Sequence, residues 1–315
     1  MAHTNIIHYS MFMPELPEVE TTKNGLKNNI TGLKVLDIWT SYNSPYFKGS
    51  KTIKDPSYFK LFKKEVVGTT ILSVERRAKN ILINIDNEKT ILIHMKMTGH
   101  LLYGLYKFNS KNKKDPWEPL SPEGLKDPFN RRVRFVITFD NGKYLALSDT
   151  RKFAKIALLE TKEAHQSDHL QELGPEPLEK SFTFEKFLEC ISKRSRSKIK
   201  QTLMDQTIIS GIGNIYADES LWRAGIHPTR RVCDIRKADL RKLYEAIRLT
   251  LRKGIDLGGD SMSDYRNIDG NKGQFQEQHR AYRRTGEKCS KKGCVGTIKR
   301  IVLAGRATHF CDRHQ

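Results

Sequence analysis

The sequence predicts an α+β protein with two domains, an N-terminal β-sandwich and a C-terminal helical domain that ends in a β-hairpin. Strand-like alternation fills roughly the first 160 residues, and helical spacing begins only after a proline-rich break near residue 175. Three cysteines and a histidine then gather at the C-terminal end. The length of 315 residues suits about two domains, each able to bury a core.

In the N-terminal part, β-branched segments separated by turn residues indicate strands. The expected strands span residues 70–74, 81–85, 90–94, 133–139 and 143–147. Asp140-Asn141-Gly142 joins the last two, because Asn-Gly is a strong hairpin turn. A helix is expected near residues 19–30, and the polar, lysine-rich stretch 103–131 is expected to form a long loop.

The composition changes at Leu173-Gly174-Pro175-Glu176-Pro177-Leu178, which has the proline and glycine content of a linker. Beyond it, Leu240, Leu243, Ile247 and Leu251 repeat at helical spacing and predict a helix that stops at Gly254. The expected units are an N-terminal extension (1–12), a β-sandwich (13–160), a linker (161–180), a helical domain (181–285) and a terminal hairpin (286–315).

The charge balance points to a polyanionic partner. Lysine and arginine number 56 against 36 acidic residues, which leaves a formal charge of +20. Nucleic acid is the commonest partner of such chains. An acidic membrane surface would need a basic amphipathic helix, which the sequence does not show. The apolar runs are too short to span a bilayer and the N-terminus has no basic leader, so we expect no membrane partner.

The C-terminal pattern Cys289-x4-Cys294-x16-Cys311-x2-His314 predicts one structural zinc ion per chain. Residues 297–303 and 306–310 fit the two strands of a hairpin that turns at Gly305. Four protein ligands leave no open coordination position, so the metal would stabilise the fold only. A disulfide or unused thiols are the alternative, which is rare in a chain without an export signal.

The string from Met13 to Thr21 contains Pro14 and Glu15. By itself it predicts a turn that enters a helix. If translation starts at Met13 and this methionine is removed, Pro14 becomes a terminal secondary amine with an appreciable neutral fraction at pH 7. Such an amine can attack the sugar carbon that bears a DNA base, and Glu15 could transfer protons beside it.

Four further strings combine cations with residues suited to DNA, although each also fits an ordinary solvent-exposed turn or face. They are Arg76-Arg77-Ala78-Lys79-Asn80, His94 to Leu101 with Met97, Asp149 to Phe153, and the basic run Lys193 to Lys200. An exposed methionine or phenylalanine could act as a wedge in DNA. Gly211 and Gly213 precede an expected helix start, whose N–H groups suit a phosphate.

Taken in order, these strings resemble the formamidopyrimidine-DNA glycosylase and endonuclease VIII family from Met13 to the C-terminus. The similar segments are PELPEVE, RRAKN, HMKMTG, LGPEPL, MDQTIISGIGNIYADESLWRAGIHP and GRATHFCDRH. The resemblance implies a β-sandwich joined by a hinge to a helix-two-turn-helix domain with a zinc hairpin. Damaged double-stranded DNA would lie in the cleft between the domains.

The resemblance also implies a base-excision-repair DNA glycosylase with AP lyase activity that acts as a monomer. The implied catalytic residues are the nucleophile Pro14, the proton donor Glu15, and the cations Lys79 and Arg306. The implied DNA-binding residues are His94, Met97, Arg132, Arg151, Phe153, Arg194, Lys200 and Asn214. Without an import signal, a bacterial cytoplasmic, nucleoid-associated location is expected.

The segment from Gly258 to Phe275 resembles the lesion-capping region of the branch that removes oxidised purines, which favours 8-oxoguanine and formamidopyrimidines over oxidised pyrimidines. The chain departs from the family at Lys96, at Arg132 and in its fourth zinc ligand, His314. It also carries twelve residues before Met13. If these remain, the Pro14 nitrogen is an amide and cannot attack. A non-catalytic damage-binding protein is then the alternative, and an RNA-binding zinc-hairpin protein is a weaker one.

Overall fold

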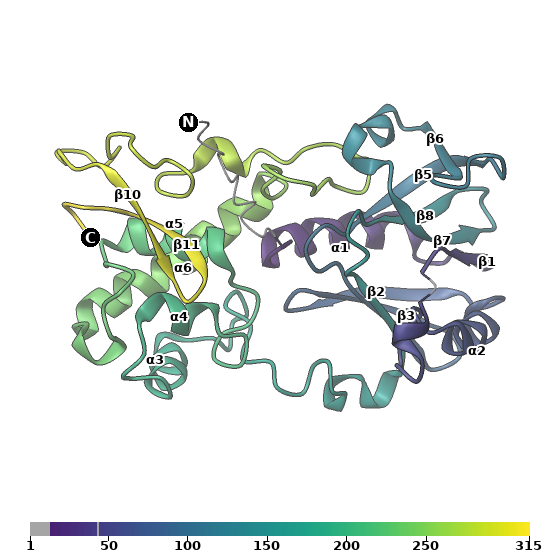
Figure 1. The fold of residues 1–315 in the computed structure, drawn as a ribbon. Coiled ribbons are helices and arrows are strands. Elements are labelled where there is room, and N and C mark those ends of the chain that lie inside the picture. The colour runs from purple at the N-terminus through teal and green to yellow at the C-terminus, as the bar shows by residue number, and fades with distance from the viewer. Residues whose placement is uncertain (1–12, 43) are drawn as a thin grey trace.

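The computed structural model describes residues 13–42 and 44–315, so the expected N-terminal extension (1–12) lies outside the described residues. Figure 1 shows two halves, a β-rich half and a helical half that carries the C-terminal hairpin. This architecture confirms the predicted α+β fold with an N-terminal β-sandwich. No helix within the described residues is long and apolar enough to cross a membrane.

The β half consists of two antiparallel sheets that enclose one core. The first sheet has the order β1-β7-β8-β5-β6 and the second β2-β3-β4-β9. The strands are β1 (Val35–Thr40), β2 (Ile71–Arg77), β3 (Asn80–Ile85), β4 (Lys89–His94), β5 (His100–Phe108), β6 (Trp117–Ser121), β7 (Val133–Phe139), β8 (Tyr144–Ser148) and β9 (Lys155–Glu160). Helix α2 (Pro56–Val66) packs Phe62 and Val66 into the same core.

The expected strands are confirmed, but the expected loop at 103–131 is wrong. Strand β5 continues to Phe108 and pairs with β6, where Phe108 faces Trp117. The rings of Trp117 and Phe108 lie 5.1 Å apart, and Trp39 of β1 lies 5.8 Å from Trp117. This aromatic cluster stabilises the hairpin. The hairpin was not predicted because the many lysines of this stretch are typical of a loop.

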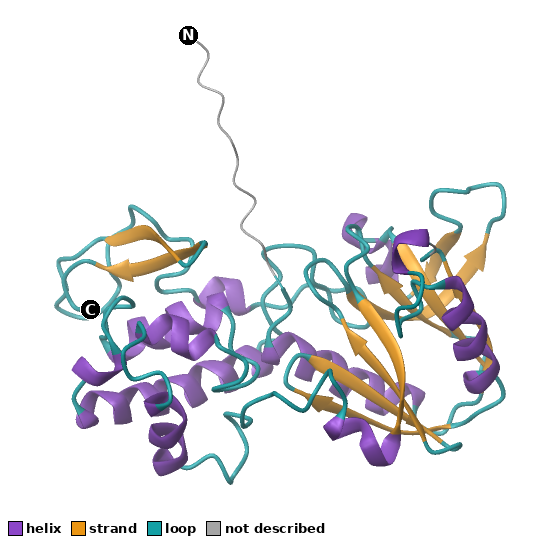
Figure 2. Ribbon diagram, turned by 60° about the horizontal axis from the view of Figure 1, so that its bottom comes forward, coloured by secondary structure: helices purple, strands orange, loops and turns teal. Residues whose placement is uncertain are grey.

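The helical half comprises α3 (Phe184–Ser192), α4 (Ile199–Met204), α5 (Asn214–Ala224) and α6 (Lys237–Asp256), followed by the hairpin β10 (Ile298–Leu303) and β11 (Arg306–Cys311). Figure 2 shows this hairpin above the helices. The predicted hairpin and the predicted helix from Leu240 are confirmed. The helix does not stop at Gly254 as expected but continues to Asp256. A Cβ on Gly254 would lie 2.5 Å from the Tyr216 ring. Close packing, rather than helix termination, explains this glycine.

Two segments besides the linker connect the halves. Helix α1 (Leu16–Ile30) places Leu16 in the helical core and Val19 in the β core. The segment that follows α6 does the reverse: Ile268 lies in the β core and Phe275 in the helical core. Ile268 O accepts from Tyr103 N at 2.7 Å. Figure 1 shows this segment and the linker crossing on opposite sides. The sequence-based domain limits stay a prediction.

Arg76 and Arg77 hold the β half against the linker, so the structure gives these two cations of the string an internal role in place of the expected DNA contact. Arg76 forms ion pairs with Glu20 at 2.6 Å and with Glu176 at 2.8 Å. Arg77 contacts Glu176 at 3.2 Å and donates to the carbonyl of Leu173 at 2.7 Å. Both guanidinium groups are therefore satisfied within the protein.

We expect Glu176→Ala to destabilise the protein by about 3 kcal/mol, because it removes the largely buried carboxylate that the Arg76 and Arg77 guanidinium groups share. The side chains of Arg76 and Glu176 are only 9% and 10% exposed. Urea unfolding measures the change. The matched control is Glu123→Ala, whose carboxylate is 82% exposed beside Lys126 and should be dispensable. Equal midpoints for the two variants would contradict the assignment.

Candidate active site

The carboxylate of Glu15 is buried at the N-terminus of α5. It accepts hydrogen bonds from the backbone N–H groups of Gly213 at 2.7 Å, Ile215 at 2.9 Å and Tyr216 at 3.4 Å. The first residue of α1 is fixed to the same loop, because Leu16 N donates to Gly211 O at 3.0 Å. An anion at a helix N-terminus is stabilised by the free N–H groups and the helix dipole. The start of α1 is thereby held against α5.

The glycines Gly211 and Gly213 serve this contact rather than the expected phosphate site. A Cβ on Gly213 would lie 2.3 Å from the Glu15 carboxyl carbon, and one on Gly211 would lie 2.7 Å from Leu16. Gly211 also has a φ of +87°. The sequence predicts a phosphate at this helix start, and in the structure the protein's own Glu15 carboxylate occupies these N–H donors instead.

Burial perturbs the titration of three groups around this point. It raises the pKa of Glu15, while Lys79 and the backbone donors oppose the rise. It raises the pKa of Glu18 to about 8, with the neighbouring Glu15 adding to the effect. Burial also lowers the pKa of Lys79, against the attraction of both carboxylates. Such shifts suit groups that exchange protons near neutral pH.

A cavity of about 570 Å³ opens between the halves beside these groups. Glu15, Lys79 and Met97 line it from the β side. Asn214 of α5 and Arg306 of β11 line it from the helical side. Five of the sequence-predicted site residues, far apart in the chain, therefore face one space. Pro14 is buried next to it, and Met13, which precedes Pro14, forms part of its wall.

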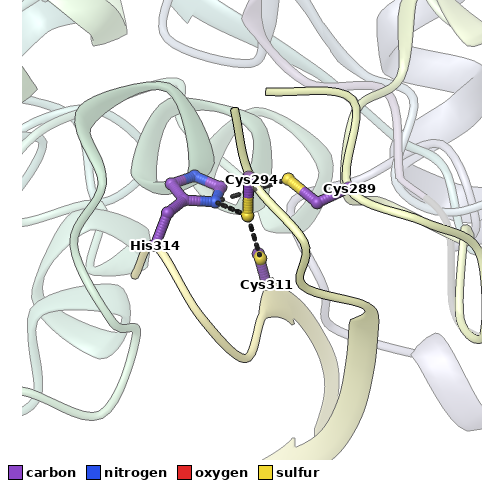
Figure 3. A group of neighbouring side chains, drawn as sticks. All are labelled: Cys289, Cys294, Cys311 and His314. Atoms are coloured by element: carbon purple, nitrogen blue, oxygen red, sulfur yellow. Dashed lines mark hydrogen bonds between the residues drawn. The ribbon is translucent and has the colours of Figure 1, made fainter. Parts of the chain in front are cut away.

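The side chains of Cys289, Cys294, Cys311 and His314 converge at the base of the hairpin (Figure 3), with all ligand atoms within 4.8 Å of one another. His314 Nδ1 lies 3.4 Å from Cys289 Sγ, and the sulfurs of Cys294 and Cys311 are 3.5 Å apart. The edges of a tetrahedral zinc site of this composition measure about 3.6–3.8 Å. His314 Nε2 donates to Trp222 O at 3.0 Å, which leaves Nδ1 for a metal.

Comparison with known proteins agrees with this geometry. The family model described as "Formamidopyrimidine-DNA glycosylase N-terminal domain" matches residues 13–156, and "Formamidopyrimidine-DNA glycosylase H2TH domain" matches residues 173–266. The formamidopyrimidine-DNA glycosylase of Heliobacterium modesticaldum is 37% identical over 96% of this chain and 100% of its own length. That of Halalkalibacterium halodurans is 38% identical over 95% and 98%.

The chain belongs to the formamidopyrimidine-DNA glycosylase family. The resemblance, the two-domain fold and the activity expected from the sequence, a bifunctional glycosylase and AP lyase acting on oxidised purines, are thereby confirmed. A solved structure of a Lactococcus lactis FPG mutant with "a Fapy-dG containing DNA" superposes with a TM-score of 0.79. It is 32% identical and covers 96% of this chain and 99% of its own.

In this member of the family, the side chains of Met97, Arg151 and Phe153 lie together. Arg151 Nη1 is 3.5 Å from Met97 Sδ, and the guanidinium lies 4.5 Å from the centre of the Phe153 ring. Phe153 is 44% exposed, so its ring is accessible at the surface. Sequence reasoning named these three residues from two separate strings, and the structure brings them into one cluster.

The other side chains predicted to contact DNA differ in whether their polar groups already have partners within the protein. Burial and nearby Lys96 lower the pKa of His94 to about 3, so its ring is neutral. His94 Nδ1 accepts from Lys96 N at 3.0 Å, which leaves Nε2–H as a donor. Arg132 is paired with Asp115 at 2.5 Å, and Arg194 with Asp205 at 3.3 Å.

Lys200 and Asn214 hold the hairpin. Lys200 is 1% exposed, and its ammonium contacts Asp218 at 2.6 Å and Thr308 Oγ1 at 2.8 Å. Asn214 Nδ2 donates to Ala307 O at 3.1 Å. These protein contacts satisfy the buried Lys200 ammonium, so the structure gives it an internal role in place of the expected DNA contact. Asn214 keeps a place on the cavity wall.

Several residues of the cavity were not predicted from the sequence. Tyr282 and Met204 line the cavity, and Gln206 bridges the loop by donating to Ile212 O at 2.8 Å and accepting from Gly211 N at 2.9 Å. Glu18 also went unassigned, although its carboxylate accepts from Glu15 N at 2.8 Å. The spacing of Glu15 and Glu18 is the helix-start signal that could have shown Glu18.

We expect the stability of the protein to fall between pH 5 and pH 8, and Glu18→Gln to reduce this slope. Folded Glu18 keeps its proton up to about pH 8, whereas the unfolded side chain loses it near 4.5. The folded state therefore binds more protons over this range, and unfolding becomes easier by on the order of 1 kcal/mol per pH unit. Urea titrations at several pH values measure the slope.

Glu20→Gln is the control for this experiment. The pKa of Glu20 is lowered by its hydrogen bonds to Lys23 and Arg76, against the effect of partial burial. Its contribution to stability is therefore present above about pH 4.5 and lost below it. The slope between pH 5 and pH 8 should match that of the unaltered protein. An unchanged slope in Glu18→Gln would rule out the assignment.

Proposed function

We propose that the chain cleaves damaged DNA through the amine of Pro14, freed by loss of Met13 and the residues before it. One observation carries this proposal: a single cavity is lined by Glu15, Lys79, Arg306 and Met13, the residue that precedes Pro14. A nucleophile, a proton donor and two cations are the groups that a glycosylase and lyase needs around a sugar. The match to the family's N-terminal model also begins at residue 13.

The proposed steps use residues in the cavity. The neutral amine attacks the sugar carbon; the N–C bond forms, and the bond to the base breaks, its electron pair leaving with the base, which is then protonated. Burial raises the pKa of Glu15, which makes its carboxyl group better able to hold a proton and deliver it to the sugar ring oxygen, so that the ring opens to an iminium. In the successive β- and δ-eliminations, Glu15, now a carboxylate, accepts a proton from a sugar carbon, and each phosphate leaves with the electron pair of its C–O bond. Lys79 and Arg306 would contact the two phosphates. Water then hydrolyses the remaining iminium, which frees the Pro14 amine and leaves a one-nucleotide gap.

Met97, Arg151 and Phe153 are proposed to fill the space left by the extruded nucleotide, and His94, Arg132, Arg194 and Asn214 to contact the backbone. The partner is damaged duplex DNA, as in the Lactococcus lactis complexes, including one with "an abasic site containing DNA" at a TM-score of 0.78. We propose that the protein acts as a monomer in a bacterial cytoplasm, associated with the nucleoid. The curated relatives named above are bacterial.

Among oxidised purines, we propose formamidopyrimidines and 8-oxoguanine as the substrates. The Fapy-dG complex of the Lactococcus lactis protein supports this choice. A second lesion class has an observation of its own, because the wild-type Lactococcus lactis protein also binds "an oxidized pyrimidine containing DNA". That structure is 32% identical to this chain with a TM-score of 0.78. Excision rates measured in parallel on duplexes that carry an oxidised purine or an oxidised pyrimidine would rank the two lesion classes as substrates.

We propose that the cluster at the base of the hairpin binds one Zn²⁺ ion with a structural role. Three thiolates and one imidazole suit zinc, and four protein ligands leave no place for a substrate. Arg306 lies on the hairpin that this cluster closes. The metal would therefore hold the strand that presents Arg306 to the cavity.

Borohydride trapping tests the amine mechanism. The protein begun at Met13 should form a covalent adduct with a duplex bearing one 8-oxoguanine, and Pro14→Gly should form less or none. The protein begun at Met1 should form none, because its Pro14 nitrogen is an amide. Lesion binding without an adduct from either form would replace the enzyme by a non-catalytic damage-binding protein. Preference for RNA in competition would indicate the zinc-hairpin alternative.

Zinc content tests the metal site. The protein should contain about one zinc per chain by elemental analysis. His314→Ala should lower this content and His314→Cys should restore it, because thiolate and imidazole are interchangeable zinc ligands. Cys233→Ala is the control, since Cys233 is exposed and lies outside the cluster. Retention of full zinc in His314→Ala would exclude histidine as the fourth ligand.

A further inference from the structure

A buried carboxylate lies beneath the cluster formed by Met97, Arg151 and Phe153. Asp149 follows strand β8 and is fully buried. Its Oδ1 accepts from Thr98 Oγ1 at 2.5 Å, and its Oδ2 accepts from Tyr42 Oη at 2.8 Å and from Ala154 N at 2.8 Å. Three donors from three segments thus converge on one side chain. A buried acceptor satisfied in this way fixes the segments that supply the donors.

Thr98 joins the two loops that carry the cluster. Its hydroxyl donates to Asp149, and the same oxygen accepts from the backbone N of Arg151 at 3.1 Å. The Arg151 side chain returns to Met97, next to Thr98 in the chain, and covers the Phe153 ring. The contacts therefore form a closed ring from the first loop to the second and back.

Both loops cross between the two sheets. Residues 95–99 leave β4 of the four-stranded sheet for β5 of the five-stranded sheet, and residues 149–154 return from β8 to β9. Each contains a lysine in the left-handed region, Lys96 at φ +56° and Lys152 at φ +57°. Lys54 Nζ donates to Lys152 O at 2.8 Å, a hydrogen bond that holds the second loop at its left-handed residue. Backbone in this region persists where surrounding contacts hold it, and it is concentrated at functional sites.

We propose that Thr98 and Asp149 are positioning residues that make Met97, Arg151 and Phe153 enter DNA as one preformed wedge. The inference rests on the wedge role in the proposed function. A wedge ordered before binding loses less conformational entropy when it inserts, and more of the contact energy remains to open the duplex. Neither Thr98 nor Asp149 needs to touch the nucleic acid for this effect.

The test compares Thr98→Val with Thr98→Ser. Valine has the shape of threonine but removes both hydrogen bonds of the hydroxyl, whereas serine keeps them. Dissociation constants are measured by fluorescence anisotropy on two probes. The first is a continuous duplex with a tetrahydrofuran abasic analogue, and the second is the same strand with a one-nucleotide gap opposite the analogue. Only the continuous duplex must be opened by the wedge. Binding does not require a free Pro14 amine.

Thr98→Val should weaken binding to the continuous duplex about tenfold and change binding to the gapped probe by less than about twofold. Thr98→Ser should match the unaltered protein on both probes, and Met97→Ala should reproduce the duplex-specific loss. Equal weakening of Thr98→Val on both probes would assign Thr98 a structural role and overturn the inference. Loss in Met97→Ala without loss in Thr98→Val would overturn it and leave the wedge intact. No duplex-specific loss in either variant would reject both.

Discussion

The placement of the Glu15 carboxylate on the N-terminus of α5 is the interaction on which the rest of the site depends. Burying a carboxylate is costly, and here three backbone donors and the adjacent Lys79 offset the cost. The contact fixes the start of α1, and with it Pro14, against a helix that comes some 200 residues later. It also requires Gly213 to have no side chain. The active centre therefore exists only when the two halves are assembled.

Short sequence patterns correctly predicted those elements whose formation depends on residues close together in the chain. The Asn-Gly turn after Asp140 and the glycine at 305 marked two hairpins, and the strands on either side of each turn pair antiparallel. The spacing of Cys289, Cys294, Cys311 and His314 predicted their convergence, because each pair sits close in the chain and the hairpin joins them. The string from Met13 to Thr21 predicted a turn that enters a helix, and α1 begins within it at Leu16.

The partners of the cations could not be predicted, because they depend on residues distant in the chain. Arg76 and Arg77 bind Glu176, a hundred residues away in the linker, and Lys200 binds Asp218 beneath the hairpin. In a chain of charge +20, each of these cations was equally suited to DNA. Only the fold distinguishes cations that stabilise the protein from those, such as Arg306 and Arg151, that remain exposed at its surface.

The exchange of residues between the two cores has a consequence for how the chain can be divided. The helical core contains Leu16 from the beginning of the chain, and the β core contains Ile268 from near its end. Cleavage within 161–180 would give two fragments, each missing a buried side chain that the other holds. Neither fragment corresponds to an autonomous folding unit. The natural outcome of such a cut is reconstitution of one noncovalent complex from two complementary pieces, and separate expression of the halves would expose apolar surface on both.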